Sequence, residues 1–231
     1  MVSAARSTAP RIALVHAVAE AIAPINAAFA ADWPEAQTFN LMDDSLSRDR
    51  AARGAIDDAM TARFVALSRY CVSTGADAVQ FTCSAFNPCI DAAQSVIDIP
   101  VLQPDAAMIE TAFTHGPRLG AIVTCGPAVD SITAQVNAFA AMMGVHPQLD
   151  VRLAEGALEA FRAGDVDEHD RRIAEAAAQL GPCDVVMLGQ YSMARAAPLV
   201  RTPGNVPLLS SPAAAVRELR ELLTPEQRSQ E

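Results

Sequence analysis

The chain repeats itself at one fixed offset, which is the separation between Arg11 and Arg118 and is called the repeat offset below. The blocks "RIALVHA" and "RLGAIVT" correspond in this way, and so do "IPVLQPDAAMI" and "VPLLSSPAAAV". The identical pairs at the repeat offset include Arg11/Arg118, Asp43/Asp150, Asp77/Asp184, Val79/Val186, Pro100/Pro207 and Leu102/Leu209. These identities gather in short apolar blocks, whereas chance matches in an alanine-rich chain would scatter. The sequence therefore predicts two similar halves.

Each half has the pattern of strands alternating with helices. Apolar runs predict strands at 12–16, 38–42, 78–81 and 101–102, and again at 119–124, 148–153, 185–188 and 207–209. Helical spacing predicts helices at 19–31, 48–74, from 87 onward and at 105–114. Uninterrupted apolar strands separated by helices are typical of parallel sheets that are covered on both faces.

The fold class predicted from this pattern is α/β, with two similar doubly wound parallel-sheet halves related by pseudo-twofold symmetry. The halves are placed at 11–117 and 118–223, and the last segment of the first is left open to pack with the second. Residues 1–10 and 224–231 are expected to be flexible termini. Because ligands of such folds bind outside the carboxyl ends of the strands, the active site is expected in the cleft between the halves.

Charge and composition exclude several classes of function. The net charge of −10 argues against nucleic acid or an anionic membrane surface as a partner. All 17 basic residues are arginine. Without lysine the chain cannot form a Schiff base, a P-loop or the Tyr-x-x-x-Lys pair of many dehydrogenases, and Arg195 after Tyr191 is no substitute because arginine stays protonated.

The cysteines favour a reduced, cytoplasmic protein. There are 5 of them, an odd number without tight spacing, and the 4 histidines are scattered, so no zinc motif is present. The N-terminal segment lacks the apolar run of a secretory signal, and no apolar stretch is long enough to span a bilayer. No metal and no organic cofactor are expected, and homo-oligomer formation is left open.

The stretch "AVQFTCSAFNPCID", residues 78–91, places Cys83 where a buried strand gives way to a helix. Backbone N–H groups at a helix N-terminus lower the pKa of a thiol, and together with Ser84 and Ser192 they can bind a carboxylate. Such a thiol can exchange a proton with carbon or add to an alkene. The alternative interpretation is a buried cysteine that only fills space.

At the repeat offset, Cys83 corresponds to Gln190 in "DVVMLGQYSMARA", residues 184–196. The two residues are therefore expected to face each other across one cleft. Tyr191 is a candidate for stacking on a ligand or donating a hydrogen bond to it, although a partly buried tyrosine explains it equally well.

Several other residues have two interpretations. His16 ends the first strand and is either a ligand-binding group or a buried histidine with its partners satisfied. The run Asp43-Asp44-Ser45 ends the second strand and is either a substrate-binding acidic pair or a helix cap provided by Ser45. Residues 165–172, "DVDEHDRR", are interpreted as a solvated, capped helix start, and Cys71 and Cys89 as inert cysteines on helices.

The chain resembles the aspartate/glutamate/hydantoin racemase superfamily, which includes glutamate racemase, hydantoin racemase, maleate isomerase and arylmalonate decarboxylase. "FTCSAF" resembles its first-cysteine motif, and "VTCGPAVDS", residues 123–131, resembles the Ala-Thr-x-Gly-Thr-Val segment that opens the second half. "MLGQYSM" stands where the family usually has Leu-Gly-Cys-x-x-Met or Leu-Gly-Cys-Thr-His. The resemblance spans roughly residues 11–222.

The resemblance implies two opposed cysteines that act on a small carboxylate, but Gln190 replaces the second one. An amide cannot exchange protons usefully near neutral pH, although it can donate hydrogen bonds to a carboxylate or enolate oxygen. Cys125 is a candidate substitute, and Thr124 matches a substrate-binding threonine of the family.

The predicted function is thus a cofactor-independent enzyme that uses Cys83 on a small carboxylate, with Gln190 as the second catalytic group. Ser84, Thr124, Cys125, Tyr191, Ser192 and His16 are the candidate substrate-binding residues. A decarboxylase or isomerase suits one thiol better than a two-base racemase does. The second candidate is a racemase in which Cys125, His16 or a carboxylate serves the second face. The alternative is a ligand-binding or regulatory protein on the same fold that has lost catalysis.

Overall fold

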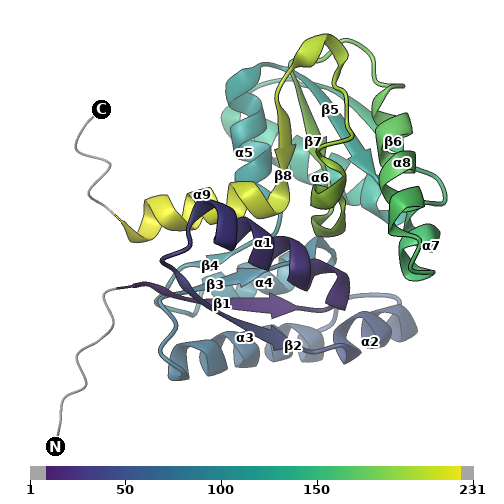
Figure 1. Ribbon diagram of the computed structural model, residues 1–231. Coiled ribbons are helices and arrows are strands. Elements are labelled where there is room, and N and C mark those ends of the chain that lie inside the picture. The colour runs from purple at the N-terminus through teal and green to yellow at the C-terminus, as the bar shows by residue number, and fades with distance from the viewer. Residues whose placement is uncertain (1–8, 225–231) are drawn as a thin grey trace, which may run out of the picture. The chain divides into compact units, whose positions relative to one another are not determined.

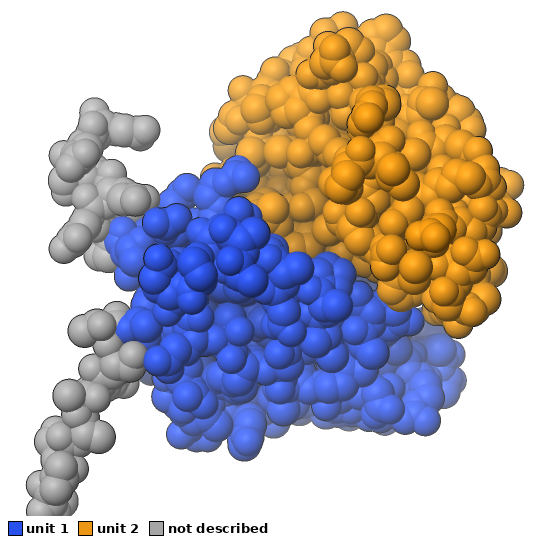
Figure 2. Space-filling model, in the orientation of Figure 1, with its two compact units in different colours: residues 1–103, 216–231 blue, residues 104–215 orange. Residues whose placement is uncertain are grey.

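The computed structural model describes residues 9–224. Residues 1–8 and 225–231, which hold most of the terminal segments predicted to be flexible, lie outside the described residues. The chain divides into two compact units (Figure 2): unit 2 is Pro104–Ala215, and unit 1 is the chain before and after it. The polypeptide leaves unit 1 just before helix α5 (Ala106–His115) and returns to it within helix α9 (Ser211–Leu223).

Unit 1 contains one parallel sheet with the strand order β2-β1-β3-β4 (Figure 1). The strands are β1 (Arg11–His16), β2 (Gln37–Met42), β3 (Ala78–Phe81) and β4 (Val101–Leu102). The α-helices are α1 (Ile22–Asp32), α2 (Ser45–Arg53), α3 (Asp58–Ser73) and α4 (Asn87–Gln94), and short 3-10 helices η1 (Ala19–Ala21) and η2 (Ser84–Phe86) precede α1 and α4. The sheet is parallel because each strand returns through a helical crossover.

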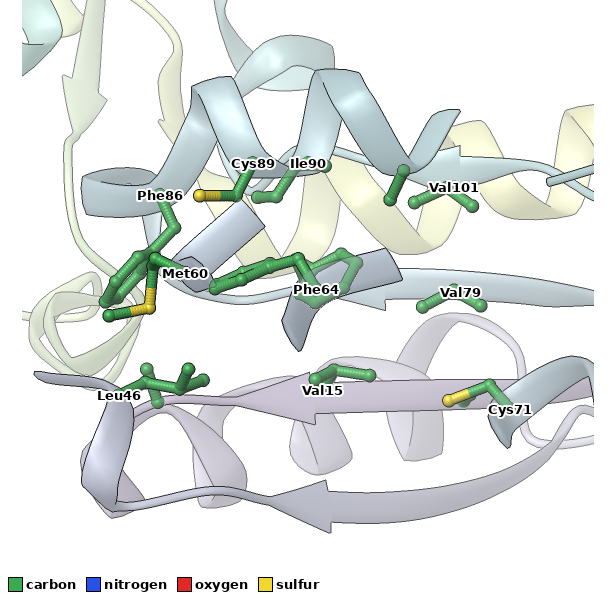
Figure 3. Packing of buried hydrophobic residues seen from close by; sticks show 14 of the residues in the cluster. Val15, Leu46, Met60, Phe64, Cys71, Val79, Phe86, Cys89, Ile90 and Val101 are labelled. Carbon is green, nitrogen blue, oxygen red and sulfur yellow. The ribbon is translucent and has the colours of Figure 1, made fainter. Parts of the chain in front are cut away.

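The core of unit 1 lies between the sheet and helices α3 and α4 (Figure 3). Side chains alternate along a strand, so Ala13 and Val15 of β1 face this layer together with Val79 and Phe81 of β3. Phe64 of α3 stacks on Phe81 with ring centroids 5.1 Å apart. Cys71 and Cys89 belong to the same apolar cluster.

Unit 2 contains a second parallel sheet with the equivalent strand order β6-β5-β7-β8. Its strands are β5 (Arg118–Val123), β6 (Gln148–Leu153), β7 (Val185–Leu188) and β8 (Leu208–Ser210). Its helices are α5, α6 (Gly126–Met143), α7 (Ala157–Arg162) and α8 (Val166–Ala177), followed by 3-10 helices η3 (Tyr191–Ala196) and η4 (Pro203–Asn205). Buried residues of α5 and α6 pack on one face of this sheet, and those of α8 and η3 pack on the other.

The strand registers confirm the repeat at the level of single residues. Val15 pairs with Phe81 in unit 1, and Ile122 pairs with Leu188 in unit 2. Val15 is separated from Ile122, and Phe81 from Leu188, by the same repeat offset that separates Arg11 from Arg118. The predicted α/β class with two similar parallel-sheet halves is therefore confirmed.

One of the matched pairs, Asp43 with Asp150, is a chance identity. Ala13 pairs with Phe39, and its equivalent Gly120 pairs with Asp150, so the structural counterpart of Asp150 is Phe39 and not Asp43. The connection from β5 to β6 is four residues longer than that from β1 to β2, and the next connection is four residues shorter. The two differences cancel by the third strand, which hides them in the sequence.

The long helix predicted at 48–74 is two helices, α2 and α3. Helix α2 ends at Gly54, whose φ of 73° is a left-handed conformation that favours glycine. Helix α3 begins after Asp57, whose side chain accepts a hydrogen bond from the Met60 amide at 2.8 Å. The prediction was wrong because the apolar positions of α3 extend backward to Ile56 at helical spacing.

Candidate functional site

Cys83 lies just beyond the carboxyl end of β3. The strand ends at Phe81, and Thr82 separates it from Cys83. Its backbone is extended, with φ −133° and ψ 106°, and it occupies the N-cap position of η2. The Cys83 carbonyl accepts a hydrogen bond from the Phe86 amide at 3.3 Å, which begins the turn into α4. The side chain is half-buried against the apolar cluster of unit 1. A half-buried cysteine therefore lies at the strand-to-helix turn.

Gln190 has the same place in unit 2. It is the N-cap of η3, and its carbonyl accepts a hydrogen bond from the Met193 amide at 3.1 Å. This bond repeats, at the repeat offset, the one between Phe86 and Cys83. The segments differ afterwards, because η2 leads into the α-helix α4, whereas η3 remains a 3-10 helix.

The Gln190 carboxamide is held within unit 2. Its Oε1 accepts hydrogen bonds from the Thr124 amide at 2.6 Å and from Thr124 Oγ1 at 2.7 Å. Its Nε2 faces Cys125 Sγ at 3.9 Å. The carboxamide oxygen of Gln190 is thus occupied by Thr124, and its NH2 group is directed toward the sulfur of Cys125.

Cys125 is the second half-buried cysteine. It forms the N-cap of the long helix α6, with Pro127 in the first turn. The helix N-terminus carries partial positive charge, which favours an anion at this position. Thr124, Cys125 and Gln190 therefore form one cluster at the carboxyl ends of β5 and β7.

The remaining three cysteines are buried thiols. Burial raises the pKa of Cys71 to about 11. Burial also raises the pKa of Cys89 and that of Cys183 above the ordinary value. Cys71 and Cys89 lie on α3 and α4, as predicted, and their surroundings disfavour a thiolate.

The candidate residues beside the two turns differ in exposure. Ser84 follows Cys83 and is half-buried, whereas Tyr191 and Ser192 are buried in η3. The Tyr191 hydroxyl donates a hydrogen bond to the Pro104 carbonyl at 3.3 Å. Tyr191 therefore links η3 to the segment at which the chain enters unit 2, in agreement with the interpretation as a buried tyrosine.

His16 is fully buried at the end of β1, and both ring nitrogens have partners. Nδ1 lies 2.9 Å from Thr82 Oγ1, and Nε2 lies 2.8 Å from Asn40 Oδ1. Burial lowers the pKa of His16, and the hydrogen bond with Asn40 opposes this effect only in part. Of the two interpretations, the geometry fits the satisfied buried histidine.

The acidic run after β2 is engaged by an arginine that sequence reasoning missed. Arg63 of α3 donates to the carboxylate of Asp43 at 2.6 Å and to that of Asp49 at 2.5 Å. Burial acts to raise the pKa of Asp43, but the hydrogen bonds from Ser45 and Arg63 outweigh it and hold this pKa below its usual value. The predicted helix cap was Ser45. The start of α2 is instead stabilised by the Asp43 carboxylate, which accepts a hydrogen bond from the Ser45 amide.

A second ionic cluster was also missed. Residues 165–172 begin α8, and Asp165 caps it by accepting from the Glu168 amide, as predicted. His169 and Asp170, however, are buried, so the prediction of a solvated segment was wrong for them. Asp170 accepts from His169 Nδ1 at 2.7 Å and from Arg195 Nε of η3 at 2.9 Å. This cluster fixes η3, which follows Gln190, against α8.

Neither a metal site nor a membrane-spanning helix is found in the part of the chain that the structure describes. Within residues 9–224 no three or more His, Cys, Asp or Glu side chains are grouped so that they could hold a metal ion. Over the same residues, no helix combines the length and apolar character that crossing a bilayer requires.

The fold and its strand ends define a class: a duplicated α/β protein with a half-buried thiol after a central strand of each sheet. Residues 15–219 match the model of the Asp/Glu/Hydantoin racemase family. The match covers most of the chain, so the chain belongs to this family. No curated protein sequence matches the chain.

Several solved structures share the fold. Allantoin racemase from Klebsiella pneumoniae has a TM-score of 0.69 and 17% identity, covering 94% of this chain and 89% of that one. Glutamate racemase isoform RacE1 from Bacillus anthracis also has a TM-score of 0.69, with 14% identity over 96% of this chain and 83% of that one. Arylmalonate decarboxylase has a TM-score of 0.57 and 20% identity, covering 94% of both chains. Identities this low establish a common fold and not a common activity.

Proposed function

We propose that the protein is a cofactor-independent enzyme that uses the Cys83 thiol to transfer a proton to or from carbon in a small carboxylate substrate. The observation that carries this proposal is the contrast among the 5 cysteines. Cys71, Cys89 and Cys183 are buried in surroundings that raise the pKa of each thiol. Cys83 and Cys125 are half-buried, and Cys83 occupies the N-cap position of η2 after β3, at the strand end where doubly wound folds bind their ligands.

Membership of the family supports proton transfer by Cys83, and Gln190 limits the types of reaction that are expected. The related structures are named as racemases and as a decarboxylase. Gln190 occupies the position equivalent to Cys83 and offers an amide donor where a second thiol would be expected. We assign Gln190, Ser84 and Ser192 to stabilising the carboxylate or the enolate that forms on it, with Cys125 as a further contact. Thr124 would act by holding the Gln190 amide, and Tyr191 is buried in η3. A reaction that needs a proton on one face, such as decarboxylation or isomerisation, suits this set best.

The test is a screen of malonates, hydantoins, amino acids and maleate in deuterated water, followed by NMR. Turnover or deuterium incorporation at the carbon beside the carboxyl group supports the proposal. The variant Cys83→Ala should lose this activity at a stability cost of only about 1 kcal/mol, since little apolar area is removed. The matched control is Cys183→Ala, which removes a buried thiol away from the strand end and should retain activity.

Two results would count against the proposal. Turnover that persists in Cys83→Ala would assign the chemistry to another group. A compound that binds without turnover or exchange in any condition would indicate a ligand-binding protein on the same fold.

A further inference from the structure

A polar network that is buried at its centre and exposed at Asn40 lies in unit 1 at the strand end before Cys83. It joins Asn26 of α1, Asn40 of β2, His16 of β1 and Thr82, which is the residue before Cys83. His16 is 0% exposed and Thr82 is 5% exposed, so the central pair is shielded from water. None of these contacts is used by the proposed reaction.

The partners determine where the protons of the network lie. Asn40 donates its Nδ2 to Asn26 Oδ1 at 3.3 Å, so Asn40 Oδ1 is directed at the histidine as an acceptor. A neutral His16 then carries its proton on Nε2, and its Nδ1 accepts from the Thr82 hydroxyl. The single hydroxyl proton of Thr82 is shared with a second, more distant acceptor, the Val15 carbonyl at 3.3 Å. Thr82 is thereby held to β1 by its side chain, and also by its amide, which donates to the same carbonyl at 3.1 Å.

Unit 2 shows that the fold does not require this polar pair. The residues equivalent to His16 and Thr82 at the repeat offset are Val123 and Gly189. They lie side by side as well, since a Cβ built on Gly189 would be 3.0 Å from Val123 Cγ1. The same strand end is thus completed by an apolar contact in unit 2. Burying a histidine and a hydroxyl in unit 1 costs free energy that hydrogen bonds only offset, so the pair calls for an explanation other than the fold.

We propose that His16 is a positioning residue for the Cys83 thiol, acting through the side chain of Thr82. The inference rests on the proposed function in one respect, which is that Cys83 is the reacting group. Thr82 is bonded to β1 through its amide and its hydroxyl just before the chain turns into η2, so the direction of its backbone determines the position of Cys83. The bond from Thr82 to His16 Nδ1 holds this turn in one orientation, and Asn40 and Asn26 hold the ring.

The hydrogen-bond partners of the His16 ring are neutral. They are Asn40 from β2 and Thr82 after β3, with Asn26 of α1 behind Asn40. The charged residue bonded to the His16 backbone is Asp43, whose amide donates to the His16 carbonyl and whose carboxylate is neutralised by Arg63. Changes in the reactivity of Cys83 in His16 variants would therefore not arise from a broken ion pair of the ring.

The experiment measures alkylation of the folded protein by iodoacetamide from about pH 6 to about pH 9.5, a range that brackets the titration of an ordinary thiol. Peptide mass spectrometry reports Cys83 and Cys125 separately in each sample, so Cys125 in unit 2 is an internal control. The variants are His16→Val, which copies unit 2, His16→Asn, whose Oδ1 can replace Nδ1 as the acceptor for Thr82, and Thr82→Val. The same series is assayed for turnover with any substrate found in the screen.

We expect His16→Val to move the midpoint of the Cys83 profile upward by about half a unit, because a loosened turn directs fewer N–H groups at the thiolate. The Cys125 profile should not move. Thr82→Val should have the same effect, the double variant should add nothing to it, and His16→Asn should restore most of the original profile. In turnover, His16→Val should lower kcat about tenfold with a smaller change in KM, since misplacing a reacting group by about 1 Å can cost up to a hundredfold.

Identical Cys83 profiles in all variants would overturn the inference. It would also be overturned by a change in both thiols together with a lower Tm, because that pattern indicates a general loss of structure. If His16→Val does not fold, His16→Asn and Thr82→Val provide the same comparison. A wild-type protein without turnover, but with a Cys83 profile that responds to His16 alone, would refute the proposed function and leave the positioning role supported.

Discussion

Thr124 donates two hydrogen bonds to one oxygen of Gln190, from its amide at 2.6 Å and from its hydroxyl at 2.7 Å. The pair joins the ends of β5 and β7 and leaves the Gln190 Nε2 beside Cys125 Sγ at 3.9 Å. The orientation of the amide therefore follows from Thr124, which is 3% exposed and needs an acceptor. This relationship gives a prediction about Gln190 that does not depend on any substrate.

Gln190→Met should be destabilising, because it removes the acceptor and leaves the buried Thr124 amide unsatisfied. We expect a loss of about 1–3 kcal/mol in the free energy of unfolding, measured with a chemical denaturant. Gln190→Glu keeps the acceptor and should lose much less, but its second oxygen would bring negative charge toward Cys125 and slow the alkylation of that thiol. Equal stability of the two variants would mean that the contact with Thr124 has no energetic weight.

Acid should destabilise the wild-type protein partly through His16. Burial lowers the pKa of His16 below its ordinary value of 6.5, so the unfolded chain takes up a proton more readily than the folded one. The contribution of His16 to stability is therefore complete above pH 6.5 and decreases as the pH falls below it toward the lowered folded pKa. Tm should fall less between about pH 7.5 and about pH 5.5 in His16→Val than in the wild type. Parallel decreases in the two proteins would contradict this assignment.

The cluster of Asp170, His169 and Arg195 predicts a localised loss of stability. Asp170→Ala removes the partner of buried His169 Nδ1 and of Arg195, and we expect a loss of about 2 kcal/mol, less than for a fully buried pair because Arg195 is 41% exposed. The matched control is Glu175→Gln on the same helix, which breaks an exposed pair with Arg171 and should leave the free energy of unfolding unchanged within error. If the two variants cost the same, the cluster does not anchor η3.

The sequence predicted the features of the fold that depend on local pattern. The strands at 78–81 and 185–188 were identified correctly because both are short apolar runs that precede a turn. The repeat was visible because the first, third and fourth strands keep one offset. The four-residue shift of β6 could not be detected, since a longer β5–β6 connection is cancelled by a shorter β6–β7 connection.

The position of Cys83 at the end of a strand could be predicted from the sequence, whereas the contacts made by the residues of unit 1 and unit 2 near the strand ends could not. Cys83 was identified by its place after an apolar run, which is a local property. Arg63 and Arg195 were not, because their carboxylate partners lie 14 to 25 residues away in sequence and are brought close only by the packing of helices. The network around His16 was missed for a similar reason, since its members lie on separate strands and on α1.

The expected stereochemical outcome of the proposed reaction follows from Gln190. With a single thiol acting on carbon, solvent hydrogen should enter from one face, because an amide neither accepts nor donates a proton usefully near neutral pH. For a substrate identified in the screen, turnover in deuterated water should therefore give one labelled enantiomer or one alkene geometry, which chiral chromatography and NMR can determine.

The variant Gln190→Cys supplies the missing thiol and should add some racemisation. The gain is limited by geometry, because proton transfer requires heavy atoms to approach to about 3 Å. The decisive measurement is made on the unmodified protein. If it washes deuterium into both enantiomers at equal rates, a second base must act on the other face. Cys125 would then be the group to replace, because it is the other half-buried thiol and lies beside Gln190.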